Sequence, residues 1–314
     1  MSLSLHNPTQ SVESGFISGN GRPAPAPMTK YVIITPARDE EQYIEQTILS
    51  VVNQSVVPIQ WIIVNDGSSD RTGEIIDRYA ASHPWITPLH RSDRGHRQAG
   101  GGVVQAFNEG YAQIKSSDWS FVVKLDADLS FDHNYFERCF VEFKRRPQLG
   151  IVGGGIYHWD NGSLKLEPGP AFHVRGATKI YKRECWDMLG GLVAAPGWDT
   201  IDEVKANMLG WSTRTFTNLK LSHHRFTGAA EGVWKDSVKS GLANYVTGYH
   251  PLFMLSKCVR RLISKHHLVG SAGLGWGFIK GYLRDVPQVQ DRALIAYTRS
   301  QQLRRLFFLE SVWK

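Results

Sequence analysis

Short apolar runs alternate with amphipathic segments through the first half of the chain, and this alternation predicts a layered α/β domain. Three runs have the β-branched or aromatic character of buried strands: Tyr31–Ile34, Trp61–Val64 and Phe121–Leu125. Between them, apolar side chains recur at helical spacing and predict helices over 40–54, after residue 70 and from Gly100 onward. This order of elements predicts a mostly parallel sheet flanked by helices.

Polar clusters follow each predicted strand. Ligands of open α/β sheets bind beyond the carboxyl ends of the strands, so we expect these clusters to share one edge: Pro36–Glu40, Asn65–Asp70 and Asp126–Asp128. Side chains two positions apart in an extended segment point the same way. Asp126 and Asp128 are therefore predicted to converge on one hard cation. For this pair taken alone, a solvated turn is the competing interpretation.

The second half of the chain is richer in glycine and loops until residue 197. Thr200 and Glu203 have the spacing of a capping box, and Gly210 stands where a glycine commonly ends a helix. This pattern places Asp199 just before a helix and Asp202 in its first turn. A predicted strand over 212–221 then leads to two adjacent histidines, His223 and His224.

Length and composition limit the class of protein. The 314 residues are 42% hydrophobic, which suffices for one large domain with an appendage. Three scattered cysteines signal neither a zinc cluster nor a disulfide framework, and favour a reducing, cytoplasmic compartment. Residues 1–29 have the composition of a flexible leader without a secretory signal, and no apolar run reaches membrane-spanning length. We predict a domain over 30–235 and a helical extension over 236–314.

The net charge of +7 is concentrated in the C-terminal part of the chain. Residues 250–314 carry eleven Lys or Arg residues against three acidic ones. Because these charges are mixed with large apolar residues, the extension is predicted to make peripheral contact with an anionic membrane, or to pack on the domain with its cations in water. A nucleic-acid-binding protein would carry basic residues on the domain as well, so no nucleic-acid partner is expected.

In their order along residues 30–228, these motifs resemble the family 2 glycosyltransferases, which have the GT-A fold. The matching segments are Thr35–Glu41, Val64–Asp70, Asp126–Asp128, and Trp198–Asp199 ahead of a helix that ends at Gly210–Trp211. The family usually has Asp where this chain has Asn65. The acid that is expected to read the base, Asp66, is kept.

The resemblance implies a metal-dependent transferase that inverts the anomeric centre of the sugar. Asp128 would hold Mg²⁺ or Mn²⁺, and Asp126 would contact the ribose or a metal-bound water. Further metal ligands would come from His224 or His223. Asp199 would be the base that deprotonates the acceptor hydroxyl, with Asp202 as second choice.

The nucleotide of the donor would lie against residues near the strand exits, namely Pro36, Ala37, Glu40, Asp66, Arg97 and Asp126. A UDP-sugar is favoured over a GDP-sugar, and the acceptor would be a glycan or a lipid-linked sugar at the inner membrane face. One alternative is transfer to polyprenyl phosphate. Another is a non-catalytic sugar-nucleotide-binding partner in an assembly, which the retention of Asp126, Asp128 and Asp199 disfavours.

Overall fold

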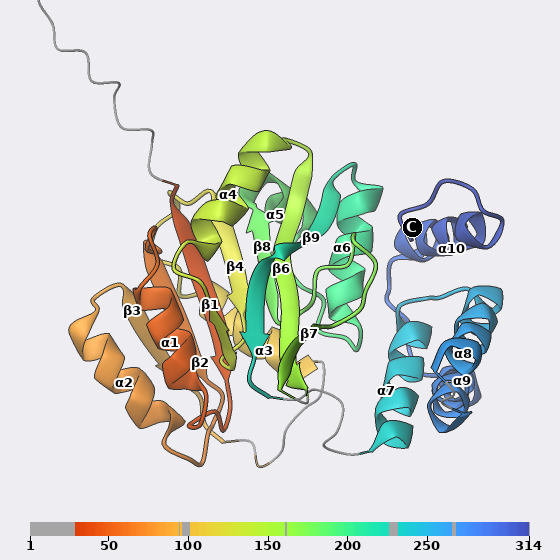
Figure 1. Cartoon of the computed structure of the whole chain (residues 1–314), viewed down its shortest axis with the longest axis horizontal. Coiled ribbons are helices and arrows are strands. Elements are labelled where there is room, and N and C mark those ends of the chain that lie inside the picture. The colour runs from red at the N-terminus through yellow and green to blue at the C-terminus, as the bar shows by residue number, and fades with distance from the viewer. Residues whose placement is uncertain are drawn as a thin grey trace, which may run out of the picture.

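The computed structural model describes residues 29–93, 95, 101–160, 162–225, 232–265 and 268–313 (Figure 1). Its strands are β1 (Tyr31–Ala37), β2 (Gln60–Asn65), β3 (Ile86–His90), β4 (Phe121–Leu125), β5 (Leu129–Phe131), β6 (Leu149–Asp160), β7 (Ser163–Leu166), β8 (Thr178–Lys182) and β9 (Ser212–His223). Its helices are α1 (Ile44–Val52), α2 (Thr72–Ser82), α3 (Gly101–Tyr111), α4 (Tyr135–Arg145), α5 (Arg183–Leu189), α6 (Trp198–Met208), α7 (Val233–Val246), α8 (Pro251–Lys265), α9 (Leu268–Leu283) and α10 (Arg292–Leu306).

One sheet organises the first 225 residues, in the strand order β3-β2-β1-β4-β8-β6-β9-β5, with β7 beside β6. The first four strands in this order are parallel to one another. Strand β8 is antiparallel to β4 and β6, while β9 is parallel to β6. The predicted helix-flanked sheet is confirmed, but it is mixed and not mostly parallel, because the second half contributes antiparallel strands.

Alternate side chains of β1 enter two separate hydrophobic cores. Tyr31 and Ile33 pack with apolar residues of α1 and α4, whereas Val32 and Ile34 pack with those of α3 and α5. Successive side chains of a strand point to opposite faces, so a strand covered on both faces must be apolar throughout. The continuous run 31–34 is therefore the signature of a central strand, and it fixes the polar exit of β1 between two layers of helices.

Three local predictions need correction. Strand β3 was absent from the predicted order, and it pairs with β2 at the edge of the sheet, where Pro88 is tolerated. Helix α1 begins at Ile44 and not at residue 40, because residues 41–43 form a turn. Residues 126–128 also form a turn between β4 and β5, so the two aspartates are not on one extended strand.

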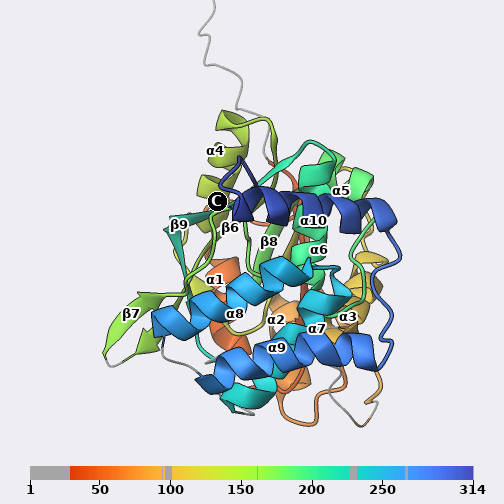
Figure 2. The same ribbon diagram turned by 90° about the vertical axis from the view of Figure 1, so that its right-hand side faces the viewer.

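Helices α7 to α10 lie on one side of the sheet domain, beside α6 (Figures 1 and 2). Leu294 of α10 packs with Ile201 and Val204 of α6 in a shared apolar cluster. No helix in the described part of the chain is both long and apolar enough to cross a membrane. The division at residue 235 stays a prediction, although α7 begins close to it.

Candidate functional site

The carboxyl ends of β1, β2 and β4 lie at one edge of the sheet, because these strands are parallel neighbours. Strand β9 runs in the same direction as β4, because β8 is antiparallel to β4, β6 is antiparallel to β8, and β9 is parallel to β6. His223 at the end of β9 is brought to Asp128 because Leu129, the residue after Asp128, pairs with His223 in the antiparallel β5–β9 ladder. Residues nearly a hundred positions apart thus meet at the predicted edge.

Asp128 is buried and makes specific contacts through only one of its carboxylate oxygens. Its Oδ2 lies 3.2 Å from Nε2 of His223 and 3.9 Å from Nε of Arg225. Its Oδ1 is buried and has no hydrogen-bond partner among the described residues. Buried polar atoms are nearly always paired, so an unpaired carboxylate oxygen at a sheet edge marks a place for a ligand.

The charges around Asp128 are mutually stabilising. Burial alone would raise the pKa of Asp128, but the hydrogen bond and charge of His223, with Arg225 and Lys124, hold this pKa below its usual value. Burial alone would lower the pKa of His223, and the bond to Asp128 raises it instead. The pair therefore favours an ionised carboxylate beside an imidazolium in the absence of a cation.

Asp126 is held by a buried lysine. Nζ of Lys124 donates to Oδ1 of Asp126 and, at 2.5 Å, to the carbonyl oxygen of Gly176. The Asp126 side chain keeps 31% of its exposure, whereas that of Lys124 keeps 3%. Burial raises the pKa of Asp126 and Lys124 opposes the rise. Lys124 therefore fixes the direction of a carboxylate that remains open to solvent.

The two adjacent histidines have different surroundings. The peptide N–H of His224 donates to the Asp128 carbonyl at 2.9 Å, while its ring Nε2 lies 2.9 Å from the Ser130 hydroxyl. Its ring also stacks on Tyr43, with 6.1 Å between centroids. Burial lowers the pKa of His224. Of the two predicted histidine ligands, the one whose ring contacts the Asp128 carboxylate is His223.

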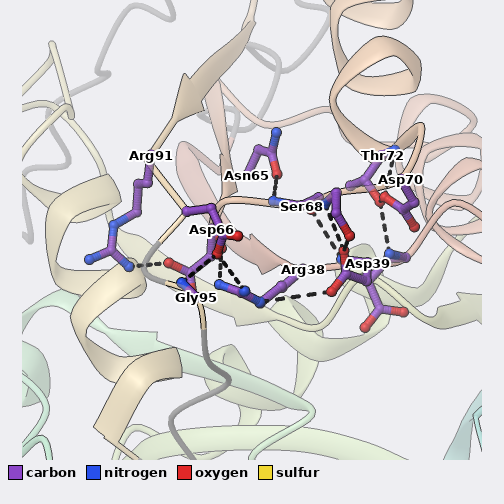
Figure 3. A network of polar contacts seen from close by, with 12 residues as sticks. Arg38, Asp39, Asn65, Asp66, Ser68, Asp70, Thr72, Arg91 and Gly95 are labelled. Carbon is purple, nitrogen blue, oxygen red and sulfur yellow. Dashed lines mark hydrogen bonds and ion pairs between the residues drawn. The ribbon is translucent and has the colours of Figure 1, made fainter.

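The loops after β1 and β2 are joined by a network of hydrogen bonds (Figure 3). Carboxylate Oδ1 of Asp39 accepts from the Ser69 N–H at 2.9 Å, and the Glu40 N–H donates to the Thr72 hydroxyl at 2.8 Å. Arg38 donates to the Asp66 carbonyl at 2.8 Å and to Asp93 at 2.7 Å. These contacts give the two predicted nucleotide-binding segments a fixed relative position.

Asn65 and Asp66 divide two roles between them. Oδ1 of Asn65 accepts from the Ser68 N–H at 3.0 Å and so closes the turn that follows β2. The Asp66 carboxylate accepts from Arg91, whose other Nη donates to Glu109 at 2.8 Å. The side-chain nitrogen of Asn65 also lies 3.1 Å from Nδ1 of His90, so both ends of its amide are used.

Three of these side chains were not predicted as part of the site: Arg91, Asp93 and Lys124. Arg91 follows β3 directly, and it was not predicted because that strand was not predicted. Arg225 donates to Glu40 at 2.6 Å, which brings the exit of β9 against the exit of β1. Pro36 and Ala37 lie at the end of β1 as predicted. Arg97 lies outside the described residues.

Helix α6 begins at Trp198, so Asp199 lies in its first turn and not just before the helix as the capping pattern predicted. The N-cap is Gly197, without a side-chain cap, so the predicted capping box is wrong. The helix does end as predicted, because Trp211 and Gly210 donate to the Ala206 and Asn207 carbonyls at 2.9 and 3.1 Å in a Schellman arrangement.

Asp199 and Asp202 differ in their contacts. The Asp199 carboxylate is half-buried and has no hydrogen-bond or ion-pair partner in the described part of the chain. Both oxygens of Asp202 accept from Nζ of the fully buried Lys179, at 2.7 and 3.0 Å. The buried position of Asp202 is thus explained by an ion pair and not by the helix dipole alone.

Glu203 completes the buried cluster in place of its predicted capping role. Its Oε1 accepts from Lys179 at 2.9 Å and from the Val174 N–H at 2.6 Å. Its Oε2 lies 2.8 Å from Nδ1 of His173. Because the cluster binds α6 to strand β8 and to the loop before it, it fixes the direction in which Asp199 projects.

Comparisons with known proteins agree with this geometry. The model of the family described as Glycosyl transferase family 2 matches residues 32–195. The uncharacterized glycosyltransferase EpsJ of Bacillus subtilis is 36% identical over 125 residues, which are 40% of this chain and 33% of that protein. The poly-beta-1,6-N-acetyl-D-glucosamine synthase of Staphylococcus epidermidis is 33% identical over 116 residues, 37% of this chain and 26% of that protein.

The matched region thus spans a third or less of these curated relatives. Among solved structures, the mannosyltransferase PcManGT of Pyrobaculum calidifontis, in complex with GDP-Man and Mn²⁺, superposes with a TM-score of 0.52 at 16% identity. That likeness covers 89% of this chain and 88% of the other. It shows a shared GT-A fold that includes the region of the C-terminal helices.

Proposed function

Because the chain belongs to glycosyl transferase family 2, we propose that it transfers a sugar from a nucleotide-sugar donor to a hydroxyl of a glycan or lipid-linked acceptor, with inversion and with a divalent metal. The observation that carries the proposal is the buried, unpaired Oδ1 of Asp128 at the edge where the strand exits meet. The relatedness to a polysaccharide synthase supports a glycan acceptor.

The described residues hold no group of three or more His, Cys, Asp or Glu ligands, so this edge would supply a divalent cation with part of its shell and leave the remainder to the diphosphate and water. Asp128, with its unpaired Oδ1, and His223 would hold the cation, and Asp126 would contact the ribose or a water of the cation. Carboxylate and imidazole ligands suit Mn²⁺, and carboxylates suit Mg²⁺. When bound, the cation would neutralise the charge that develops on the departing diphosphate.

Asp199 is proposed as the base. Its carboxylate is unpaired among the described residues, half-exposed, and directed by a helix that the Lys179 cluster holds in place. Gly176 lies between Asp199 and the Asp126–Asp128 turn. Its carbonyl oxygen accepts from Lys124, and a Cβ added to it would lie 3.3 Å from Cβ of Asp199. A base on the face of the sugar opposite the diphosphate removes the proton of the acceptor hydroxyl during a single displacement, and a single displacement inverts the anomeric centre.

The nucleoside is proposed to lie between the loops after β1 and β2. Pro36 and Ala37 form the floor at the end of β1, and Glu40 and Asp66 are held by Arg225 and Arg91. Asp66 would accept from an N–H of the base, and a UDP-sugar is our preferred donor. Arg97 would act near the diphosphate. The hydrogen bonds between the two loops hold these residues in position before the donor binds, and this lowers the entropic cost of binding.

A thermal-unfolding panel tests the proposal. UDP, GDP, CMP and dTDP are each added with and without Mn²⁺ to wild type, to Asp128→Ala, and to Asp187→Ala as an exposed-acid control. A nucleotide at a hundred times its Kd should add about 2.7 kcal/mol to the free energy of unfolding. We expect this gain for one nucleotide, only with metal, in wild type and Asp187→Ala. Absence of any gain in wild type would contradict nucleotide binding at this edge, and with it the proposed transferase.

A further inference from the structure

Helix α8 carries apolar side chains on the face that it turns to solvent. Leu252, Leu255, Val259 and Ile263 recur at helical spacing, and they are 56, 61, 45 and 74% exposed. They line a shallow groove of about 500 Å³ together with Ser256 and Arg260. An exposed apolar stripe of this length on a protein surface indicates an interaction site.

Helix α9 lies beside α8 and repeats the pattern (Figure 2). Its solvent-facing stripe includes Leu268, Trp276, Ile279 and Leu283, which are 74, 47, 50 and 71% exposed. The opposite face of α9 has glycines that pack closely on α7, together with the buried Leu274 and Phe278. Two neighbouring helices therefore present one apolar surface, which we call the α8–α9 face.

The charge of this face has a single sign. Between Pro251 and Arg284 the sequence has six Lys or Arg residues and no Asp or Glu. Of these, Lys257, Arg260 and Arg284 are exposed. Apolar side chains bordered by cations, with no acids between them, are complementary to a surface that is anionic at its headgroups and apolar beneath them. A protein partner would not require both features over the whole length of two helices.

We propose that the α8–α9 face binds the surface of a membrane that contains anionic phospholipids, with the two helices lying in the plane of the headgroups. Leu255, Ile263 and Trp276 would insert below the phosphates, while Arg260, which lines the groove, would contact them. The binding is a property of the face and does not depend on transferase activity. It would hold the sheet domain beside a membrane in which a lipid-linked acceptor resides.

Flotation with vesicles tests this docking. The full chain is mixed with vesicles of phosphatidylcholine alone, or of phosphatidylcholine with phosphatidylglycerol, at low and high salt. We expect the protein to float with the anionic vesicles, and to be released as the salt concentration rises, because screening weakens the cationic contribution. A protein that remains unbound to anionic vesicles at low salt would overturn the proposal.

Substitutions separate the two contributions. Leu255→Ser with Ile263→Ser should weaken vesicle binding at least about tenfold, since two apolar side chains no longer leave water. Arg260→Gln should weaken binding to anionic vesicles about fivefold and reduce its salt dependence. The matched control is Leu49→Ser with Val57→Ser, which changes apolar residues of 43 and 49% exposure on the sheet domain and should leave binding unchanged.

Two further measurements keep the outcome interpretable. Circular dichroism of each variant should be that of wild type, because the substituted side chains are exposed. Light scattering after size exclusion should give the same mass for wild type and Leu255→Ser/Ile263→Ser. If wild type is instead a dimer that this double variant dissociates, and vesicles compete poorly with dimerisation, the face is an interface between copies and the membrane proposal is wrong.

Discussion

Two carboxylates three positions apart on α6 have opposite environments, and this difference separates catalysis from stability. Asp199 is half-buried with no partner in the described region, while Asp202 has both oxygens bonded to Lys179. We expect Asp199→Asn to lower kcat by roughly 10²–10⁴, the usual contribution of a general base, with little change in the KM for the donor. Its free energy of unfolding should stay within about 0.5 kcal/mol of wild type.

Asp202→Asn is the matched comparison. It leaves a fully buried lysine short of one of its two charge partners, and breaking a buried ion pair costs about 3 kcal/mol. Denaturant unfolding of the two variants checks the expected stabilities, and steady-state kinetics checks the expected values of kcat. A fully active Asp199→Asn enzyme with an inactive but stable Asp202→Asn enzyme would reverse our assignment of the base.

His173 should make stability depend on pH. Burial alone would lower the pKa of His173, but the charge and hydrogen bond of Glu203 raise it above the usual histidine value. A histidine with a raised folded pKa binds its proton more tightly in the folded state. Its contribution is therefore complete below the unfolded pKa, about 6.5, and is lost as pH rises through the folded pKa.

The measurement is the difference in free energy of unfolding between wild type and His173→Gln over a series of pH values. We expect this difference to be largest in mildly acidic solution and to shrink as the pH rises above neutrality. The comparison cancels the contributions of the other histidines, including His223. A difference that stays constant with pH would mean that His173 does not gain its proton from the contact with Glu203.

At the scale of single residues, the sequence predicted which residues lie at the site better than it predicted which residues they contact. Asp66, Asp126, Asp128 and His223 all lie at the predicted edge, because the order of apolar runs determines where strands end. Contacts between distant exits were not predictable, since nothing local to Arg225 indicates that it meets Glu40. The spacing of Thr200 and Glu203 predicted a cap, but burial beside Lys179 gave Glu203 a stronger set of partners.

At the scale of elements, the loop before β8 packs closely on the first turn of α6. A methyl group on Gly176 would lie 2.9 Å from Cζ2 of Trp198 and 3.4 Å from Oδ2 of Asp199, while its backbone is outside the left-handed region. We expect Gly176→Ala to displace Asp199 and to lower kcat roughly tenfold to a hundredfold, because small misplacements of catalytic groups are costly. Donor binding, measured by calorimetry, should change little.

Gly169→Ala is the control for this prediction. It adds the same methyl group in the same connecting segment, with no atom within 4 Å. Its kcat should equal that of wild type. Equal kcat for both variants would show that the loop can move without disturbing Asp199.

Elements were predicted where the periodicity was strong and missed where a local signal opposed it. The runs at 31–34 and 61–64 are apolar on both faces because helices cover both sides of the sheet. Strand β3 has Pro88 in its middle, which argues against a strand unless it lies at an edge, and the edge position becomes visible only in the assembled sheet. The turn at 126–128 was likewise not predicted, because the largely apolar run Phe121–Leu125 before it extends the strand pattern.

For the whole molecule, the sequence left open whether the extension packs on the domain or faces a membrane. The structure shows that parts of it pack: Leu294 joins Ile201 and Val204 of α6, and Tyr249 lies against Trp313, which in turn meets Phe172. The α8–α9 face remains outside these contacts. The apolar, glycine-rich segment 268–279 is explained by this division, because its glycines pack on α7 with Leu274 and Phe278, while Leu268, Trp276 and Ile279 are exposed.

Because the extension shares a core cluster with α6, we expect the sheet domain and the four C-terminal helices to unfold together. A methyl group on Gly277 would lie 2.0 Å from the carbonyl oxygen of Val238 in α7, whereas one on Gly275 would meet only Sγ of Cys258 at 3.7 Å. Gly277→Ala should therefore destabilise the protein by about 1–3 kcal/mol. Gly275→Ala should stabilise it by about 0.5–1 kcal/mol, since alanine favours a helix.

Differential scanning calorimetry checks both the sign and the cooperativity. Wild type and both variants should each show a single transition, shifted down for Gly277→Ala and up for Gly275→Ala. If α7–α10 were an independent domain, two transitions would appear and Gly277→Ala would move only one of them. A single transition that moves with Gly277→Ala would mean that helix packing far from the strand exits contributes to the position of α6, and through it to the direction of Asp199.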